Sequence, residues 1–231
     1  MLTLLISLSI VVRQNKVDPY KALLKDVFDQ PSSAISLGKL NVAMNEASVE
    51  NASALKRFRF ATLAVAAHDK ASLKPNESKR YASAARPLLK TEELKLSPYY
   101  GYVIARLGLI IGITKDPEIE GARLYYEARH DGQSAFLYGT SLTHHASAGV
   151  RAQALKFALE AKEKRKDSLE VRWLVAGGYF EKADFTKEKQ YWQAAIDAYQ
   201  KTLELTKTND ERETINRFIS LARKGLSKAV K

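Results

Sequence analysis

Three short hydrophobic phrases, each with a glycine in its middle, limit the fold of this chain more than any other feature. They cover residues 104–111, 135–142 and 173–180. In each phrase the glycine stands four residues after one apolar or small residue and three before another. Such intervals place all three residues on one face of an α-helix. The glycines are 31 and 38 residues apart, and a period of that length predicts an array of helix pairs.

Composition and turn signals agree with a helical chain. Among 231 residues there are only 11 glycines and 6 prolines, and no run alternates apolar with polar residues as an amphipathic strand would. Helix starts are predicted at Asp18-Pro19, Ser97-Pro98, Ser168 and Thr208-Asn209-Asp210, where a capping side chain or an early proline suits a first turn. We therefore expect an all-α protein of about eleven or twelve helices joined by short connections.

The last phrase carries a family resemblance. Residues 168–206 resemble a tetratricopeptide repeat, a helical hairpin with a large residue, a glycine and an aromatic residue on its first helix. Trp173, Gly177 and Phe180 match the first helix, and Ala195 and Tyr199 match the second. Small residues of this kind allow two helix backbones to approach, and the aromatic residue fills the space beside them.

The resemblance is looser elsewhere. Ala176 and Thr202 stand where the family favours leucine and a second alanine, and 18 residues separate Gly177 from Ala195 across a longer connection, which we place at residues 181–188. The units around Gly108 and Gly139 match only in part. The resemblance covers about residues 98–206, and an array of a different helical hairpin stays open as an alternative.

The resemblance implies a right-handed superhelix of antiparallel helical hairpins. The expected organisation is a hydrophobic N-terminal segment at 1–15, degenerate hairpins at 16–97, repeats at 98–206 and a capping helix at 207–231. The expected packing positions are Gly108, Gly139, Trp173, Gly177, Phe180, Ala195 and Tyr199. At such a position Gly177→Leu should overpack the helix contact and cost a few kcal/mol.

Such arrays imply a concave groove, lined by the first helix of each hairpin, that binds an extended peptide or a partner helix. Counting around those helices places Tyr102, Arg106, Phe136, Thr140, Thr143 and Glu181 in the groove. The lysine and asparagine set with which some members of the family hold a chaperone's terminal carboxylate is missing from these positions. We therefore expect a non-catalytic scaffold that binds a protein or peptide, and not a chaperone adaptor.

The net charge of +11 supports an alternative partner. Residues 51–100 contribute +6 and residues 201–231 contribute +4. A protein that binds nucleic acid or another polyanion carries such an excess, because neutralised phosphates release counterions. Solvated helix faces carry it too, and no motif of a known nucleic-acid reader accompanies it. Nucleic acid is therefore a possible partner that we do not favour.

Residues able to support catalysis or to bind metal are sparse. The chain has no cysteine and four histidines, and neither His144 nor His145 has a second ligand three or four residues away. Phosphate loops and nucleophile motifs are missing. We expect no enzymatic activity, no cofactor and no metal site.

The N-terminus allows two interpretations. Leu2 to Val12 form an apolar run of 11 residues, too short to span a bilayer. It suits the hydrophobic region of a secretory signal, but no basic residue precedes it and no small-residue cleavage site follows it. An ordinary first helix in the cytoplasm is slightly favoured, and export or membrane association through this segment stays open.

Overall fold

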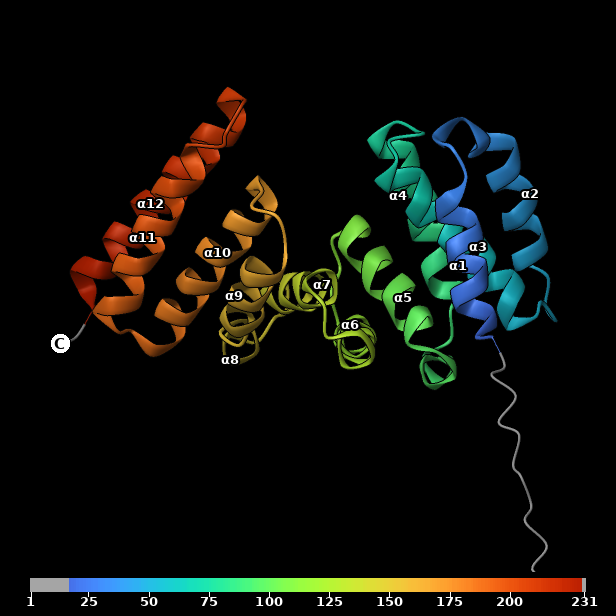
Figure 1. Ribbon diagram of the computed structural model, residues 1–231, viewed down its shortest axis with the longest axis horizontal. Helices are drawn as coiled ribbons and strands as arrows, with labels where there is room; N and C mark the ends of the chain where they lie inside the picture. Colours follow the sequence, from blue (N-terminus) through green and yellow to red (C-terminus); the bar gives the residue numbers. More distant parts are fainter. Residues whose placement is uncertain (1–16, 230–231) are drawn as a thin grey trace, which may run out of the picture.

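The computed structural model describes residues 17–229, and they form an elongated row of helices (Figure 1). Within this range there are twelve α-helices and three short 3-10 helices, with no β-strand. The first half contains α1 (Pro19–Asp29), η1 (Ser32–Ala34), α2 (Leu37–Ala47), α3 (Ala54–Asp69), α4 (Pro75–Ala85), η2 (Arg86–Leu88) and η3 (Thr91–Leu96). The second half contains α5 (Pro98–Ile111), α6 (Asp116–Arg129), α7 (Gly132–Thr143), α8 (Ala148–Arg151), α9 (Ala154–Lys164), α10 (Leu169–Thr186), α11 (Lys189–Leu203) and α12 (Asn209–Lys228). The all-α class is confirmed.

The apolar run that could act as a secretory signal or a membrane anchor lies outside the described residues. The expected hydrophobic segment at 1–15 is not among the described residues. From residue 17 to residue 229, no helix combines the length and the apolar character needed to cross a bilayer.

The predicted helix starts are confirmed. The carboxylate of Asp18 accepts a hydrogen bond from the Tyr20 amide at 2.9 Å, which caps α1. The hydroxyl groups of Ser97, Ser168 and Thr208 cap α5, α10 and α12 in the same way. Each side chain satisfies an amide that has no partner within its own helix.

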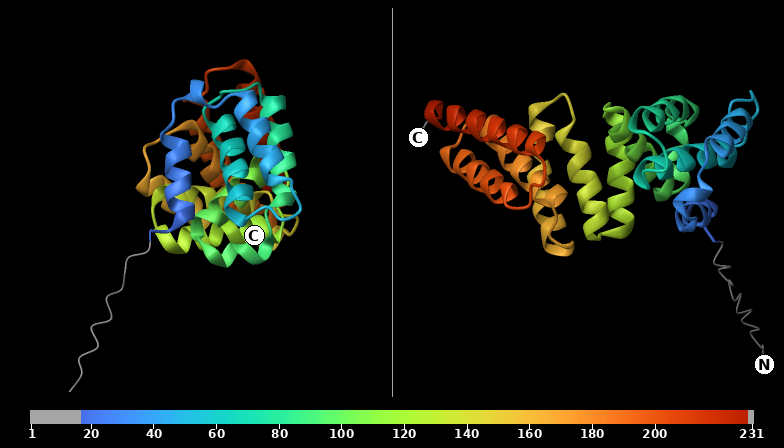
Figure 2. Two further views of the ribbon diagram at one scale, coloured as in Figure 1. Left: turned by 90° about the vertical axis from the view of Figure 1, so that its right-hand side faces the viewer. Right: turned by 90° about the horizontal axis from the view of Figure 1, so that it is seen from above.

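Helix α3 is the centre of the first half, and α1, α2, α4 and α5 pack around it. Seen from above, this bundle forms one end of the row and α11 and α12 form the other (Figure 2). Residues 60–67 of α3 are buried without interruption, as in a helix that is apolar on every side. Within the described part of this half, α3 is therefore shared by four neighbouring helices.

Aromatic rings and hydrogen bonds join this bundle to α5. Tyr20, Phe58 and Tyr100 form a cluster with ring centroids 5.0 to 5.6 Å apart. The Ser97 hydroxyl donates to the Asp18 carboxylate at 2.6 Å, which ties the start of α5 to the start of α1. The bundle and the array that follows it thus share α5.

The second half is a row in which each helix packs mainly on its sequence neighbours. The three expected helix pairs are in contact, as α5 with α6, α7 with α9, and α10 with α11. Its buried residues form small successive clusters, the last of which joins α10, α11 and α12. Stacked units of this kind bury their apolar faces only against adjacent units.

The connection between α10 and α11 differs from the sequence expectation. The polar connector expected at 181–188 is mostly helix, because α10 continues to Thr186 and only Lys187 and Glu188 join it to α11. Lys187 has a left-handed backbone with φ of 59°, which ends α10 sharply. The segment between α7 and α9 holds the short helix α8. The extra length of the last unit therefore lies in a longer first helix.

Glycines permit the closest contact between α5 and α6. A Cβ atom added to Gly101 would lie 2.5 Å from the carbonyl oxygen of Gly121, and one added to Gly121 would lie 2.6 Å from that of Gly101. The two backbones therefore touch, and neither residue could carry a side chain without a shift of the helices. Neither glycine lies at the centre of the three phrases.

We predict that Gly101→Ala lowers the free energy of unfolding by about 1–3 kcal/mol, because its methyl group would overpack a contact between two backbones. The control is Gly38→Ala on the exposed face of α2, where the nearest atom lies 3.9 Å from the added Cβ. That variant should be neutral or up to about 1 kcal/mol more stable, from helix propensity. Urea unfolding followed by circular dichroism measures the stability of both variants. Equal stability of the two would contradict the backbone contact between α5 and α6 at Gly101.

Candidate functional site

A groove of about 600 Å³ lies between α7, α10 and α12, with one residue of α11 in its wall. Its apolar side chains are Phe136, Leu169, Trp173, Leu174, Phe180 and Phe218. Four carboxylate side chains and three threonines line it as well. A concave, mainly apolar surface with a few polar groups is the usual form of a binding site.

The residues that line the groove recur at intervals of three or four along each of three helices. Trp173, Gly177 and Phe180 recur at intervals of four and three along α10, and Phe136, Thr140 and Thr143 do so along α7. Along α12 the intervals are four and four, through the residues Asp210, Thr214 and Phe218. Side chains at these intervals share one helix face. Three neighbouring helices therefore present one stripe each to the same groove.

Aromatic rings hold the floor of the groove together. Phe218 lies edge-on to Trp173 and to Phe180, at centroid distances of 5.6 and 5.9 Å, and stacks on Tyr199 at 5.5 Å. Tyr199 is 1% exposed, whereas the other three rings are only partly buried. Edge-on and stacked pairs stabilise beyond their buried area. The floor is thus a packed cluster with one apolar side open to the groove.

The two adjacent glycines of α10 have different surroundings. A Cβ atom on Gly178 would lie 2.9 Å from the Cα atom of Leu155 in α9, whereas one on Gly177 would meet only the Tyr199 hydroxyl, at 4.0 Å. The close helix contact expected at Gly177 is therefore made by Gly178. Because it has no side chain, Gly177 keeps the groove open above the Tyr199 hydroxyl.

The other expected packing residues lie in or beside helix contacts. A Cβ atom on Gly139 would lie 3.3 Å from atoms of both Leu174 and Phe157, so this glycine faces α9 and α10 together. Gly108 faces the Glu118 side chain of α6. Ala195 is fully buried in the cluster of α10, α11 and α12.

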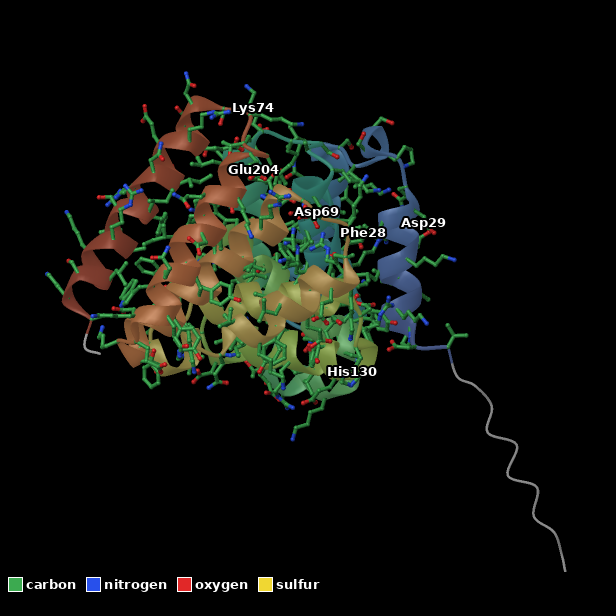
Figure 3. All side chains as sticks on the ribbon, turned by 60° about the vertical axis from the view of Figure 1, so that its left-hand side comes forward. Phe28, Asp29, Asp69, Lys74, His130 and Glu204 are labelled. Atoms are coloured by element: carbon green, nitrogen blue, oxygen red, sulfur yellow. The ribbon has the colours of Figure 1, made fainter. Side chains whose placement is uncertain are left out.

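The expected groove residues divide into two groups. Phe136, Thr140, Thr143 and Glu181 line the groove described above. Tyr102 and Arg106 do not, because the bundle around α3 covers this face of α5. Tyr102 is 8% exposed, with its ring edge-on to Phe28, and Arg106 pairs with Asp69 at the end of α3. Phe28 and Asp69 are labelled in Figure 3, beside the N-terminal helices.

The last helix contributes to the groove, which its sequence pattern did not indicate. Asp210, Thr214 and Phe218 of α12 form one wall of the groove, although this helix was expected only to cap the array. Gly225 allows α12 to pack closely against α11, because a Cβ atom on this residue would lie 2.6 Å from the Trp192 ring. The spacing of Phe218 was visible in the sequence, but nothing in the sequence showed that α10 would share this face.

The carboxylates of the groove are held in different ways. Glu181 accepts a hydrogen bond from the Arg151 guanidinium at 2.6 Å. Glu211 accepts from the amides of Lys207 and Thr208 at 3.2 and 3.1 Å, and hydrogen bonding lowers its pKa. Hydrogen bonds from the Ser168 side chain and from its own amide lower the pKa of Glu170. The hydrogen bonds to Glu170 and Glu211 favour the charged form of these two carboxylates.

Two histidines, His144 and His145, lie at or near the groove. The Nε2 atom of His145 lies 3.3 Å from the Asp116 carboxylate, while His144 borders the groove. In the described part of the chain, His, Asp and Glu side chains do not form a group of three or more that could hold a metal ion.

No protein-family model, curated protein or solved structure matches this chain. The structure itself defines the class, an all-α protein whose helices pack against their neighbours in a way compatible with a helical repeat.

We predict opposite effects for the same substitution at the two adjacent glycines. Gly178→Ala should lose about 1–3 kcal/mol of stability, because its methyl group meets the α9 backbone. Gly177→Ala should be neutral or gain up to about 1 kcal/mol, because the methyl group enters open space and helix propensity improves. Thermal unfolding of both variants measures the difference, and a lower melting temperature for Gly177→Ala would contradict this assignment.

We also predict that Tyr199 contributes to alkaline unfolding. Burial, and next the Glu181 carboxylate, raises the pKa of Tyr199 above its ordinary value of 10.0. Its stabilising contribution is complete below pH 10 and is lost as the pH rises further, because the unfolded chain releases the phenol proton first. Above pH 10 the wild type should lose up to about 1.4 kcal/mol per pH unit more than Tyr199→Phe. Urea unfolding from pH 8 to 11 tests this, and parallel curves over the whole range would contradict it.

Proposed function

We propose that this protein is a non-catalytic scaffold that binds a segment of a partner protein in the groove between α7, α10 and α12. The observation that carries the proposal is the partly buried aromatic floor formed by Trp173, Phe180 and Phe218. Large apolar side chains gathered in one concave surface mark sites of association in soluble proteins. Aromatic residues of this kind also dominate the energy of such interfaces.

The dimensions of the groove suit a peptide. Along α10 the lining runs from Leu169 to Glu181, which is about 18 Å at 1.5 Å per residue. An extended peptide covers that distance with about five or six residues. Side chains from three helices line this length, so a chain that lies along α10 would contact all three.

Occupation of the groove can be blocked at Gly177 without disturbing a helix contact. We predict that Gly177→Leu keeps the fold and removes partner binding, because its side chain would project over the Tyr199 hydroxyl. The matched control is Gly38→Leu, the same substitution at an exposed position of α2. Each variant and the wild type would serve as bait in an extract of the native cells, with quantitative mass spectrometry of the captured proteins.

Proteins captured by the wild type and by Gly38→Leu, but not by Gly177→Leu, are the expected result. A captured set that is the same for all three baits would place binding elsewhere and contradict the proposal. Circular dichroism of each bait shows that the loss does not come from unfolding.

A second candidate function rests on the C-terminal half of α12. Its exposed basic residues are Arg217, Arg223, Lys224 and Lys228, and no acidic residue follows Glu213 in this helix. Such a stripe supports binding of a polyanion outside the groove. A salt titration with generic RNA distinguishes the two candidates, because a polyanion site requires measurable affinity at low salt that falls as salt rises.

A further inference from the structure

The charge of the groove is opposite to the charge of the chain. The sequence carries a formal net charge of +11, with 37 Lys and Arg residues against 26 Asp and Glu residues. The charged residues that line the groove are nevertheless Glu170, Glu181, Asp210 and Glu211, and the described lining contains no Lys or Arg. A surface of one sign within a chain of the other sign selects its partner by charge.

Three of these carboxylates lie where α10 and α12 begin. Glu170 belongs to the first turn of α10, and Asp210 and Glu211 belong to the first turn of α12. Part of their charge complements the helix dipoles, and the Glu211 carboxylate accepts two backbone amides. Glu170 and Asp210 are exposed and form no ion pair with another described residue. Two carboxylates at this end of the groove are thus accessible to a bound cation.

One basic residue of the chain already lies near this end of the groove. The guanidinium of Arg165 stands over the Phe136 ring, 4.3 Å from its centroid, and its charge lowers the pKa of Glu170. Arg165 offsets one negative charge and Arg151, paired with Glu181, offsets another, which leaves an excess of two of the four carboxylates. The contact also shows that a cation can lie over the aromatic wall of the groove with a carboxylate nearby, an arrangement that stabilises an Arg or Lys side chain.

We infer that the segment bound in the groove is a cationic peptide, with Lys or Arg toward the starts of α10 and α12 and a large apolar side chain on the Trp173, Phe180 and Phe218 floor. This inference rests on the proposed function and adds the chemistry of the partner. An acidic segment would bring like charges together across a partly apolar surface, which costs free energy. The same repulsion excludes a nucleic-acid backbone from the groove.

The test uses the full chain and a display library of random twelve-residue peptides. Selection is carried out in parallel on the wild type and on Gly177→Leu, so that peptides bound in the groove are those enriched on the wild type alone. The expected groove peptides have more Lys and Arg than Asp and Glu, together with at least one aromatic or large aliphatic residue.

The outcomes distinguish a failure of the cationic preference from a failure of the proposed function. Groove-dependent peptides that are neutral or acidic would overturn the cationic preference and leave the proposed function in place. A selection in which no enriched peptide depends on the groove would overturn both. Groove-dependent peptides rich in Lys and Arg support both.

The rim carboxylates are then tested with one enriched cationic peptide. Its affinity, measured by fluorescence anisotropy, should fall about 3- to 10-fold in the Glu170→Gln and Asp210→Asn double variant, the range for two exposed charge pairs. The matched control is the Glu163→Gln and Glu213→Gln double variant, which removes two exposed carboxylates outside the groove lining. The difference should shrink from about 0.05 to about 0.5 M salt, because screening shortens the range of the charges. Equal affinity of the two double variants at low salt would overturn the role of the rim.

Discussion

Close approach of successive helix backbones at glycine is the constraint on which this structure depends. Gly101 and Gly121 let α5 touch α6, Gly178 lets α10 touch Leu155 of α9, and Gly225 lets α12 pack under the Trp192 ring. Each contact sets how far one helix stands from the next. Because interiors are close-packed, a single methyl group at such a point displaces a whole helix. The spacing of the row, and hence the width of the groove, follows from these few positions.

The groove is a consequence of that spacing. With α9 held against Gly178, an adjoining face of α10 lies toward α7 and α12, and its aromatic residues meet Phe218. Tyr199 supports the cluster from beneath, and Gly177 leaves the space above it open. Two adjacent glycines of one helix, about 100° apart around it, thus serve the packing on α9 and the open space of the groove. Gly178 is packed against the α9 backbone, whereas Gly177 borders open space. One helix can therefore be tightly packed and still leave an apolar surface exposed in the groove.

Much of the helix pattern could be predicted from local signals. The caps at Asp18, Ser97, Ser168 and Thr208 depend on interactions within a few residues, and the three helix pairs join helices that lie near one another in the chain. The prediction for Gly177 was wrong in its detail, because adjacent glycines lie about 100° apart around a helix. Helical spacing shows which residues share a face but not which neighbour covers it. For the same reason Tyr102 and Arg106 were assigned to a groove that the bundle around α3 excludes.

The sequence by itself determined an all-α chain, the starts of its helices and the residues that share each helix face, since these depend on hydrogen bonds and periodicity over a few residues. Only the tertiary structure decided that α3 would become the centre of a bundle, that α12 would form a wall of the groove, and that four carboxylates would gather in a basic protein. These features join residues about eighty positions apart in the chain, such as Asp18 with Ser97 and Phe136 with Phe218. They depend on which faces pack together, and that choice is made by the closest fit of whole helices.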